Sequence, residues 1–330
     1  MSVSLEYLQR CSAETGYRIG PLEKVVRLGE MAADLARHPF LGSVLVLKGG
    51  TALNLCFGPP KRLSVDLDYN YIGYLERVKM LEARPAVEQA VSELARRQGY
   101  RVQQSADAFA GRKFYLIYRS VLGQEERIEV DLNFLFRIPI AGTEMRDLWQ
   151  PGELDRLHVR VVSLEEILVG KVLALLDRGA IRDAWDVAYL PEPVAGVLRS
   201  VPFRRWFIAL SSVLEHLLST YTRERFEALT TERDITERLA PLLAEAAPAK
   251  ADLIARVWAS VGGLLLLESH EEDFTAAIQR GELRPDLLFP VNPEEAGRIA
   301  VHPAILWKIE NVRNYMATQR KINVDRKKYL

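Results

Sequence analysis

The chain has 330 residues, of which 48% are hydrophobic and 27% are charged, and its 44 basic side chains balance its 44 acidic ones. This composition is that of an ordinary globular protein with room for two domains, and the neutral balance gives no overall indication of nucleic-acid binding. Two cysteines exclude a disulfide framework, and no apolar run approaches membrane-spanning length, so with no signal peptide we expect a cytoplasmic protein.

The first seventy residues predict a helix followed by two strands. Apolar residues at helical spacing from Leu22 to Leu35 predict a helix that stops at "HPF". "SVLVLKGG" is typical of a buried strand that ends in a Gly-Gly turn, and "TALNLCF" then begins a helix. In "LSVDLDYNYIG" apolar and polar residues alternate, which predicts a half-buried strand with Asp66 and Asp68 on its polar face.

The middle of the chain predicts a helix over 76–98 and then a hairpin. "KFYLIYRS" and "EERIEVDLNFLF" form its two strands across the loop "VLGQ", with Glu129, Asp131 and Asn133 on one face of the second. "LHVRVV" is a further strand, and Ser163 with Glu166 predicts a capping box for the helix that Gly179 ends. Beyond the Pro-rich stretch 191–202 only helices are expected, with "GGLLLLE" as a buried helical segment.

Three carboxylates fall on two of these predicted strands: Asp66 and Asp68 on one, and Asp131 on another. Side chains two residues apart on a strand point the same way, so the three can converge if the strands are neighbours. Mg²⁺ prefers oxygen ligands, commonly one or two carboxylates together with substrate phosphates. The pattern therefore predicts a metal site, with Glu129 as an alternative to Asp131 because both lie on the same face.

The Gly49-Gly50-Thr51 turn would present backbone N–H groups and a helix N-terminus to an anion. Alone, a Gly-Gly pair is usually a tight turn, and Asp-x-Asp on a polar strand face is usually a solvated edge. The glycine turn followed by Asp-x-Asp and a later strand carboxylate is more specific than either the turn or the carboxylates alone. A nucleoside triphosphate with its metal would use both, because its phosphates bind the turn and its metal binds the carboxylates.

At these residues the chain resembles a known family. "LKGGTAL…KRLSVDLDYNY" is similar to the signature of the AbiEii/AbiGii-type (MenT-like) nucleotidyltransferase toxins, a branch of the DNA polymerase β-like nucleotidyltransferase superfamily. "SLEEILVGKVLALLDRGAIRDAWDVAYL" resembles the family's second signature, a helix with a lysine, then Arg, then Arg-Asp-x-x-Asp. Both lie between residues 44 and 190, and beyond about residue 200 the chain resembles the family only in being helical.

The resemblance implies a role for each matching residue. Asp66, Asp68 and Asp131 would hold Mg²⁺, with Mn²⁺ as the alternative ion, and Asp131 would be the base toward the incoming hydroxyl. The implied catalytic residues are Asp66, Asp68, Asp131, Lys171 and Asp186. The implied nucleotide-binding residues are Lys48, Gly49, Gly50, Thr51, Lys171 and Arg182.

Simpler interpretations stand beside these roles. Without the family, Lys171 would be an exposed helix lysine, and Lys48 would simply flank the turn. Arg178, Arg182 and Asp183 would form ion pairs that orient two helices. Trp307 is expected in the core rather than as a base-stacking surface. The basic tail from Arg313 to Lys328 is either solvated or a contact for RNA phosphates.

The resemblance implies an α+β fold. A nucleotidyltransferase domain over residues 1–195, with a polymerase β-like mixed, mostly antiparallel sheet and flanking helices, would precede an α-helical domain over 196–330. It implies a toxin that transfers a nucleoside monophosphate from an NTP to an acceptor hydroxyl, the 3′ end of tRNA, with a separately encoded antitoxin as partner. The alternatives are a protein or small-molecule acceptor, and a non-enzymatic nucleotide-binding module. No motif selects the nucleobase.

Overall fold

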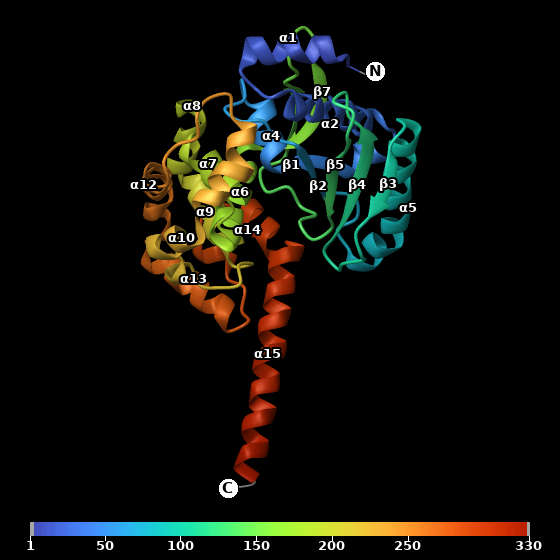
Figure 1. Cartoon of the computed structure of the whole chain (residues 1–330). Helices are drawn as coiled ribbons and strands as arrows, with labels where there is room; N and C mark the ends of the chain where they lie inside the picture. The colour runs from blue at the N-terminus through green and yellow to red at the C-terminus, as the bar shows by residue number, and fades with distance from the viewer. Residues whose placement is uncertain (1–2, 329–330) are drawn as a thin grey trace.

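The computed structural model describes the backbone of residues 3–328 and the side chains of residues 3–319. A sheet with flanking helices forms one half of the molecule, a body of helices forms the other, and one long helix projects away from both (Figure 1). The strands of the described residues are β1 (Leu45–Lys48), β2 (Asp66–Tyr71), β3 (Arg101–Gln104), β4 (Gly111–Arg119), β5 (Glu125–Asn133), β6 (Thr143–Leu148) and β7 (Leu157–Val162).

Helices precede, connect and follow these strands, with short helical turns between several of them. The helices of the described residues are α1 (Leu5–Thr15), α2 (Ile19–Arg37), α3 (Leu41–Val44), α4 (Gly49–Cys56), α5 (Arg77–Arg97), α6 (Leu164–Arg178), α7 (Ile181–Ala188), α8 (Glu192–Ala195), α9 (Val201–Ser211), α10 (Arg223–Leu229), α11 (Glu232–Asp234), α12 (Lys250–Val261), α13 (Ser269–Gln279), α14 (Pro293–Ala300) and α15 (Pro303–Lys328). No helix within residues 3–328 is both long and apolar enough to span a bilayer.

The strands form one sheet in the order β3-β4-β5-β2-β1-β7-β6. The pairs β2–β5 and β1–β7 are parallel, and the other neighbouring pairs are antiparallel. The predicted mixed, mostly antiparallel sheet is therefore confirmed. The predicted hairpin is also present, because β4 and β5 pair along their whole length across the 120–124 turn.

The parallel pairing of β2 with β5 fixes the polar row of the sheet. Asp68 lies opposite Asp131, Asp66 opposite Glu129, and Asn70 opposite Asn133. The intervening Leu67, Val130 and Leu132 are fully buried. Because successive side chains on a strand point to opposite faces, this register collects the polar side chains of two strands on one face.

Helices cover the sheet and connect it to the helical half. Helix α2 packs on β2, β5 and β7, and α5 packs on β3 and β4. Helix α4 contacts β1, β2 and β6, while α6 contacts α4 on one side and α9 on the other. Helix α7 packs against α12, so α6 and α7 join the two halves. A domain boundary at residues 195–196 stays a prediction.

The sequence missed strands β3 and β6 and extended β2 too far. Both missed strands lie at the edges of the sheet, where one side is unpaired, and most of their side chains are exposed, so they lack an apolar alternation. The predicted strand from Leu63 begins only at Asp66. The backbone N–H of Leu63 donates instead to the carbonyl of Leu242 in the helical half, at 2.8 Å.

Two local predictions also need correction. Ser163 caps α6 by accepting from the N–H of Glu166, but the Glu166 carboxylate does not close a capping box. It accepts from the N–H of Ile140 at 2.8 Å instead. The segment 262–268 is a short helical turn followed by an extended residue, and Leu266 is 75% exposed, so it is not a buried helix.

Candidate active site

The glycine turn connects β1 to α4 and leaves the start of that helix uncapped. Gly49 has φ of 74°, a left-handed conformation that side chains disfavour. A Cβ at this position would overlap the Asp68 carboxylate and lie 2.9 Å from Asp68 Cβ. No side chain caps the N-terminus of α4. The first N–H groups of this helix are therefore available to an anion, and only glycine permits the close approach of the turn to Asp68.

Gly50 and Thr51 are the buried residues of this turn. The Thr51 hydroxyl donates to the backbone carbonyl of Asp66, and the side chain is fully buried. A Cβ at Gly50 would lie 3.0 Å from Ser64 Oγ and 3.1 Å from an Arg62 nitrogen. The Thr51 hydroxyl is therefore committed to holding α4 on β2, which leaves backbone N–H groups as the contribution of these two residues to anion binding.

The carboxylates of β2 have different partners and different proton affinities. Asp66 Oδ2 lies 3.3 Å from an Arg182 guanidinium nitrogen, and Ser64 donates to its other oxygen at 3.2 Å. Burial alone would raise the pKa of Asp66, but the charges of Arg182, Arg62 and Lys171 outweigh it and lower the pKa. Burial and then the charge of Asp66 raise the pKa of Asp68 to about 6, although Lys48 and Lys171 act in the opposite direction.

The third carboxylate lies on β5 and faces the same space as Asp68. Asp131 is the direct register partner of Asp68 and forms an ion pair with Lys113 at 3.4 Å. Glu129 lies opposite Asp66, pairs with Arg127 at 2.9 Å, and is not among the residues that line the adjoining cavity. The geometry thus favours Asp131 over Glu129, the alternative that the sequence left open.

Lys171 belongs to a buried network of ions between α6, α7 and α4. Its ammonium group lies 2.8 Å from Asp183 and 3.0 Å from Asp186, and only 6% of the side chain is exposed. Arg178 also contacts Asp183, at 2.8 Å. The interpretation of Lys171 as an exposed helix lysine is therefore wrong. The ion pairs expected for Arg178 and Asp183 do join α6 to α7.

Arg62 completes this network, and sequence reasoning missed it. Its guanidinium group binds both oxygens of Asp186, at 2.7 and 2.6 Å, and is 2% exposed. Asn54 donates to the same carboxylate at 3.0 Å. Burial alone would raise the pKa of Asp186, but the charges of Arg62 and Lys171 lower it to about 2. The only signal was position, because Arg62 immediately precedes the alternating strand inside the quoted signature.

A cavity of about 420 Å³ gathers half of the predicted residues. Its sheet side presents Lys48, Gly49, Asp68 and Asp131, and Lys171 lies on its helical side. Gly50, Thr51, Asp66, Arg182 and Asp186 are not among its lining residues. Arg182 nevertheless reaches the site through Asp66, and Asp186 through Lys171. Lys48 faces both the cavity and the ring of Phe136, 5.6 Å from its centroid, so it does more than flank the turn.

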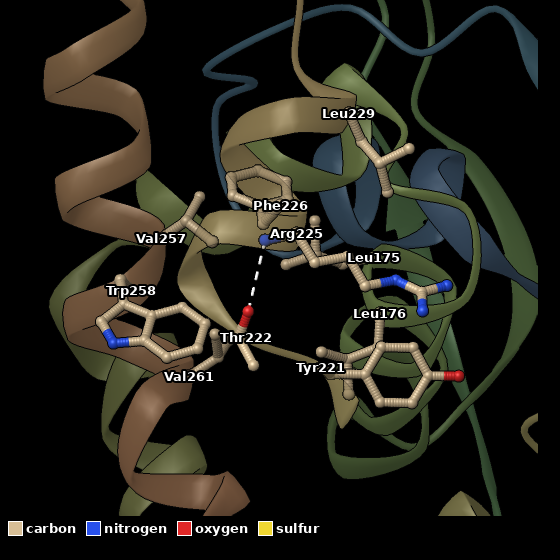
Figure 2. A pocket seen from close by; sticks show the side chains of 10 residues that line it. All are labelled: Leu175, Leu176, Tyr221, Thr222, Arg225, Phe226, Leu229, Val257, Trp258 and Val261. Carbon is tan, nitrogen blue, oxygen red and sulfur yellow. Dashed lines mark hydrogen bonds between the residues drawn. The ribbon is translucent and has the colours of Figure 1, made fainter. Parts of the chain in front are cut away.

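A much smaller cavity in the helical half has a different character. It measures about 20 Å³ and lies among α6, α10 and α12, between mostly apolar side chains (Figure 2). The polar side chain of Thr222 is turned to the N-terminus of α10, where it accepts from the N–H of Arg225. A space of this size holds about one water molecule, so it is a packing gap rather than a substrate site.

The donor set fits a hard divalent cation that shares its ligands with a substrate. Within the described residues no three or more His, Cys, Asp or Glu side chains are grouped so that they could hold a metal ion, so Asp66, Asp68 and Asp131 do not come together as a set of three. Mg²⁺ does not require one, because it commonly uses one or two carboxylates and takes its remaining ligands from water and phosphate. Asp68 and Asp131 provide such a pair, because they are direct register partners and line the same cavity.

Comparisons with known proteins identify a family and a related fold. A family model described as "Nucleotidyl transferase AbiEii toxin, Type IV TA system" matches residues 33–280. Among solved structures, MenT4, a nucleotidyltransferase toxin from Mycobacterium tuberculosis H37Rv, aligns with a TM-score of 0.59 and 20% identity, over 91% of this chain and 99% of that one. At this identity the likeness indicates a shared fold. No curated protein matches.

Proposed function

Because the chain belongs to the family of AbiEii nucleotidyltransferase toxins of type IV toxin–antitoxin systems, we propose that the cavity between β2, β5 and α6 is its active site. There a nucleoside monophosphate would pass from an NTP to an acceptor hydroxyl, with Mg²⁺ as the cofactor and pyrophosphate as the leaving group. The observation that carries this proposal is the register that sets Asp68 beside Asp131, facing Lys171 across one cavity.

Some of the site residues would bind the metal and the leaving phosphates, and Asp131 would act on the attacking hydroxyl. Asp68 and Asp131 would hold the ion, which supplies charge stabilisation for the transferring phosphoryl group, while Asp66, the third predicted ligand, pairs with Arg182 beside the cavity. The N–H groups of the glycine turn and the ammonium of Lys171 bind the β- and γ-phosphates. Asp131 accepts the proton of the acceptor hydroxyl as its oxygen bonds to the α-phosphorus. The bond to the bridging oxygen breaks, and pyrophosphate leaves toward the glycine turn.

Asp186 has a supporting part in this proposal. Its two oxygens already accept from Arg62, Lys171 and Asn54, and the side chain is fully buried. A carboxylate with this many donors is a poor candidate for contact with substrate. We therefore assign it the positioning of Lys171 rather than contact with the reacting atoms.

An adjoining cavity supports an RNA acceptor. It measures about 800 Å³ and is lined by residues from the end of α9, from α13 and from α15. It shares Asp177, Val213 and Leu214 with the 420 Å³ cavity of the proposed active site, here called the nucleotide cavity. Its lining includes the rings of Trp307 and Tyr315, which are 38% and 66% exposed, so the expectation that Trp307 is a core residue is wrong. Aromatic side chains stack on unpaired bases, which suits a single-stranded 3′ end such as that of tRNA.

The test is transfer of label. The protein is incubated with Mg²⁺, total RNA and each α-labelled NTP in turn, and RNA, protein and small molecules are then separated. We expect label on the 3′ end of tRNA with one NTP. Asp68→Ala should abolish the label while the melting temperature shows a folded protein. Label on protein or on a small molecule would mean that the acceptor is not RNA. Label transfer that survives Asp68→Ala would overturn the proposed metal site.

A partner follows from the family as well. A type IV toxin–antitoxin system pairs the toxin with an antitoxin, and we propose that a separately encoded protein fills this role. Expression of the chain alone should arrest growth, and co-expression with the neighbouring open reading frame should relieve that arrest. Growth arrest that no neighbouring open reading frame relieves would contradict the proposal of a separately encoded antitoxin.

A further inference from the structure

Asn70 is a polar residue of the 420 Å³ nucleotide cavity that has no part in the proposed function. It lies on β2 two residues beyond Asp68, lines the cavity, and is 2% exposed. Its side-chain oxygen Oδ1 is buried and has no hydrogen-bond partner among the described residues. Buried polar atoms are nearly always paired, so an unpaired acceptor in a cavity indicates a donor supplied by a ligand.

The neighbouring Asn133 provides the contrast. It lies opposite Asn70 on β5 and lines the same cavity. Its Oδ1 accepts from the backbone N–H groups of Leu135 and Phe136, at 2.8 and 2.9 Å. Asn133 therefore stabilises the turn after β5. The same residue type one strand away has no such contact, so the unpaired state of Asn70 is a property of its position.

The position of Asn70 relative to the glycine turn suggests what the ligand group is. Lys48 lies opposite Asp68, and the turn that follows Lys48 sits against the Asp68 carboxylate. Asn70 lies opposite Val46, two residues farther from the turn. Same-face neighbours on a strand are about 6.6 Å apart. Along the polar row the order is thus phosphate turn, metal carboxylate, amide.

We propose that the Asn70 amide binds the ribose of the nucleotide substrate. This inference rests on the proposed function. In an NTP the sugar lies on the far side of the α-phosphate from the leaving phosphates. If those phosphates lie at the turn and the α-phosphate at Asp68, the sugar hydroxyls come to Asn70. A hydroxyl donates to Oδ1 and accepts from the amide N–H, which matches an amide that has no partner in the protein.

The test measures sugar discrimination and stability together. The four ribonucleoside triphosphates and their 2′-deoxy and 3′-deoxy counterparts are titrated with Mg²⁺, without acceptor, into the parent protein and Asn70→Leu, which has a similar shape but no polar atoms. We expect the parent to prefer the ribonucleotide over one deoxy form by about 10-fold, and the variant to prefer it by less than about 3-fold.

The nucleotide-free melting temperature separates a binding role from a structural one. Removing an unpaired buried amide should leave the melting temperature of Asn70→Leu equal to or above that of the parent. The matched control Asn133→Leu should melt lower, because it deprives two backbone N–H groups of their acceptor.

Three outcomes would overturn the assignment and leave the proposed function standing. One is an unchanged ribose preference in a folded Asn70→Leu. Another is an unchanged nucleotide affinity together with a raised KM for the acceptor in the label-transfer assay, which would place Asn70 at the attacking hydroxyl. The third is a melting temperature of Asn70→Leu as low as that of Asn133→Leu. A parent protein that binds none of the nucleotides would overturn the proposed function itself, and this assignment with it.

Discussion

Gly49 is the residue at which backbone conformation and site chemistry coincide. Its φ of 74° is one that alanine tolerates poorly, and a Cβ would also overlap the Asp68 carboxylate. Gly123 has φ of 89° in a surface turn, and a Cβ there would meet nothing within 4 Å. The pair therefore separates the cost of the backbone conformation, about 1–2 kcal/mol, from the displacement of Asp68.

We predict that Gly49→Ala reduces nucleotidyl transfer by 100-fold or more, on the order of a lost contact to developing charge, because Asp68 must move. Gly123→Ala should lower the melting temperature about as much as Gly49→Ala does, and it should keep transfer within about 3-fold of the parent. Both variants are compared by label transfer and by thermal melting. Comparable activity in the two variants would mean that Asp68 tolerates displacement.

Lys171 differs from a surface lysine in both burial and partners. Lys171→Ala would leave Asp183 and Asp186 buried with one cation fewer, and breaking a buried ion pair from one side costs about 3–5 kcal/mol. Lys79 forms an exposed pair with Glu76 at 3.0 Å, which is worth about 0–1 kcal/mol.

We predict that Lys171→Ala lowers the free energy of unfolding in urea by several kcal/mol and weakens NTP binding at a temperature where it stays folded. Lys79→Ala should change neither measurably. Equal NTP affinity in the two folded variants would remove Lys171 from the phosphate site and leave it a structural role only.

Glu166 makes stability depend on pH. Burial raises its pKa from an ordinary 4.5 to about 7, although the N–H of Ile140 and the charge of Lys48 oppose the shift. Between these two values the folded protein holds the proton and the unfolded chain does not. The contribution of Glu166 to stability therefore falls as the pH rises from 4.5 to 7, and it stays low above 7.

We predict that Glu166→Gln, which keeps an oxygen for Ile140, is more stable than the parent at pH 8 by about 1–3 kcal/mol and gains little at pH 5. Urea unfolding of both proteins at the two pH values gives the difference in free energy of unfolding between variant and parent. The other titrating groups are the same in both proteins, so their contributions cancel. A gain that is the same at both pH values would mean that Glu166 titrates normally.

Among the elements, α15 is the one whose role the packing leaves open. It leaves the body after Ile309, the last of its buried residues with described side chains, and projects away from both halves (Figure 1). Arg313 donates to the carbonyl of Gly281 at 2.7 Å and so ties the helix to the end of α13. The other basic residues of the predicted tail, Arg320, Lys321, Arg326, Lys327 and Lys328, lie outside the described side chains.

We predict that a chain truncated after Gln319, which keeps the Arg313 contact and Tyr315, stays folded and binds tRNA more weakly with a flatter dependence on salt. Each phosphate that a basic residue neutralises adds to the slope of log affinity against log salt, so removing five basic residues should reduce it. The melting temperature serves as the control for folding. An unchanged affinity and slope would move the RNA contact to the cavity lined by Trp307 and Tyr315.

In the whole molecule, the site is assembled where the two halves meet. The sheet contributes the carboxylates, and α6 contributes Lys171, while the Arg62–Asp186 pair holds α7 against the strand that carries Asp66 and Asp68. Helix α7 in turn packs on α12 of the helical half. Substitutions at the α7–α12 contact are thus connected to the active site through Asp186 and Lys171.

The sequence by itself determined which residues share a face. Alternation in β2 and β5 placed Asp66, Asp68 and Asp131 on polar strand faces, and helical spacing with Ser163 and Gly179 bounded α6. These are local properties, because side-chain direction repeats every two residues in a strand and every 3.6 in a helix. The polar face of the Asp-x-Asp strand and the bounds of α6 could be predicted for this reason, whereas the mixed sheet was expected only from the resemblance to the family.

Only the tertiary structure decided which of these faces meet. The pairing of Asp68 with Asp131 rather than Glu129 depended on a parallel register between strands about sixty residues apart, and the burial of Lys171 depended on its contacts with Asp183 and Asp186. Arg62 and Asp186 are 124 residues apart in the chain, and neither periodicity nor spacing relates them. Partner choice at such separations follows from how whole elements pack, and that information is absent from any local pattern.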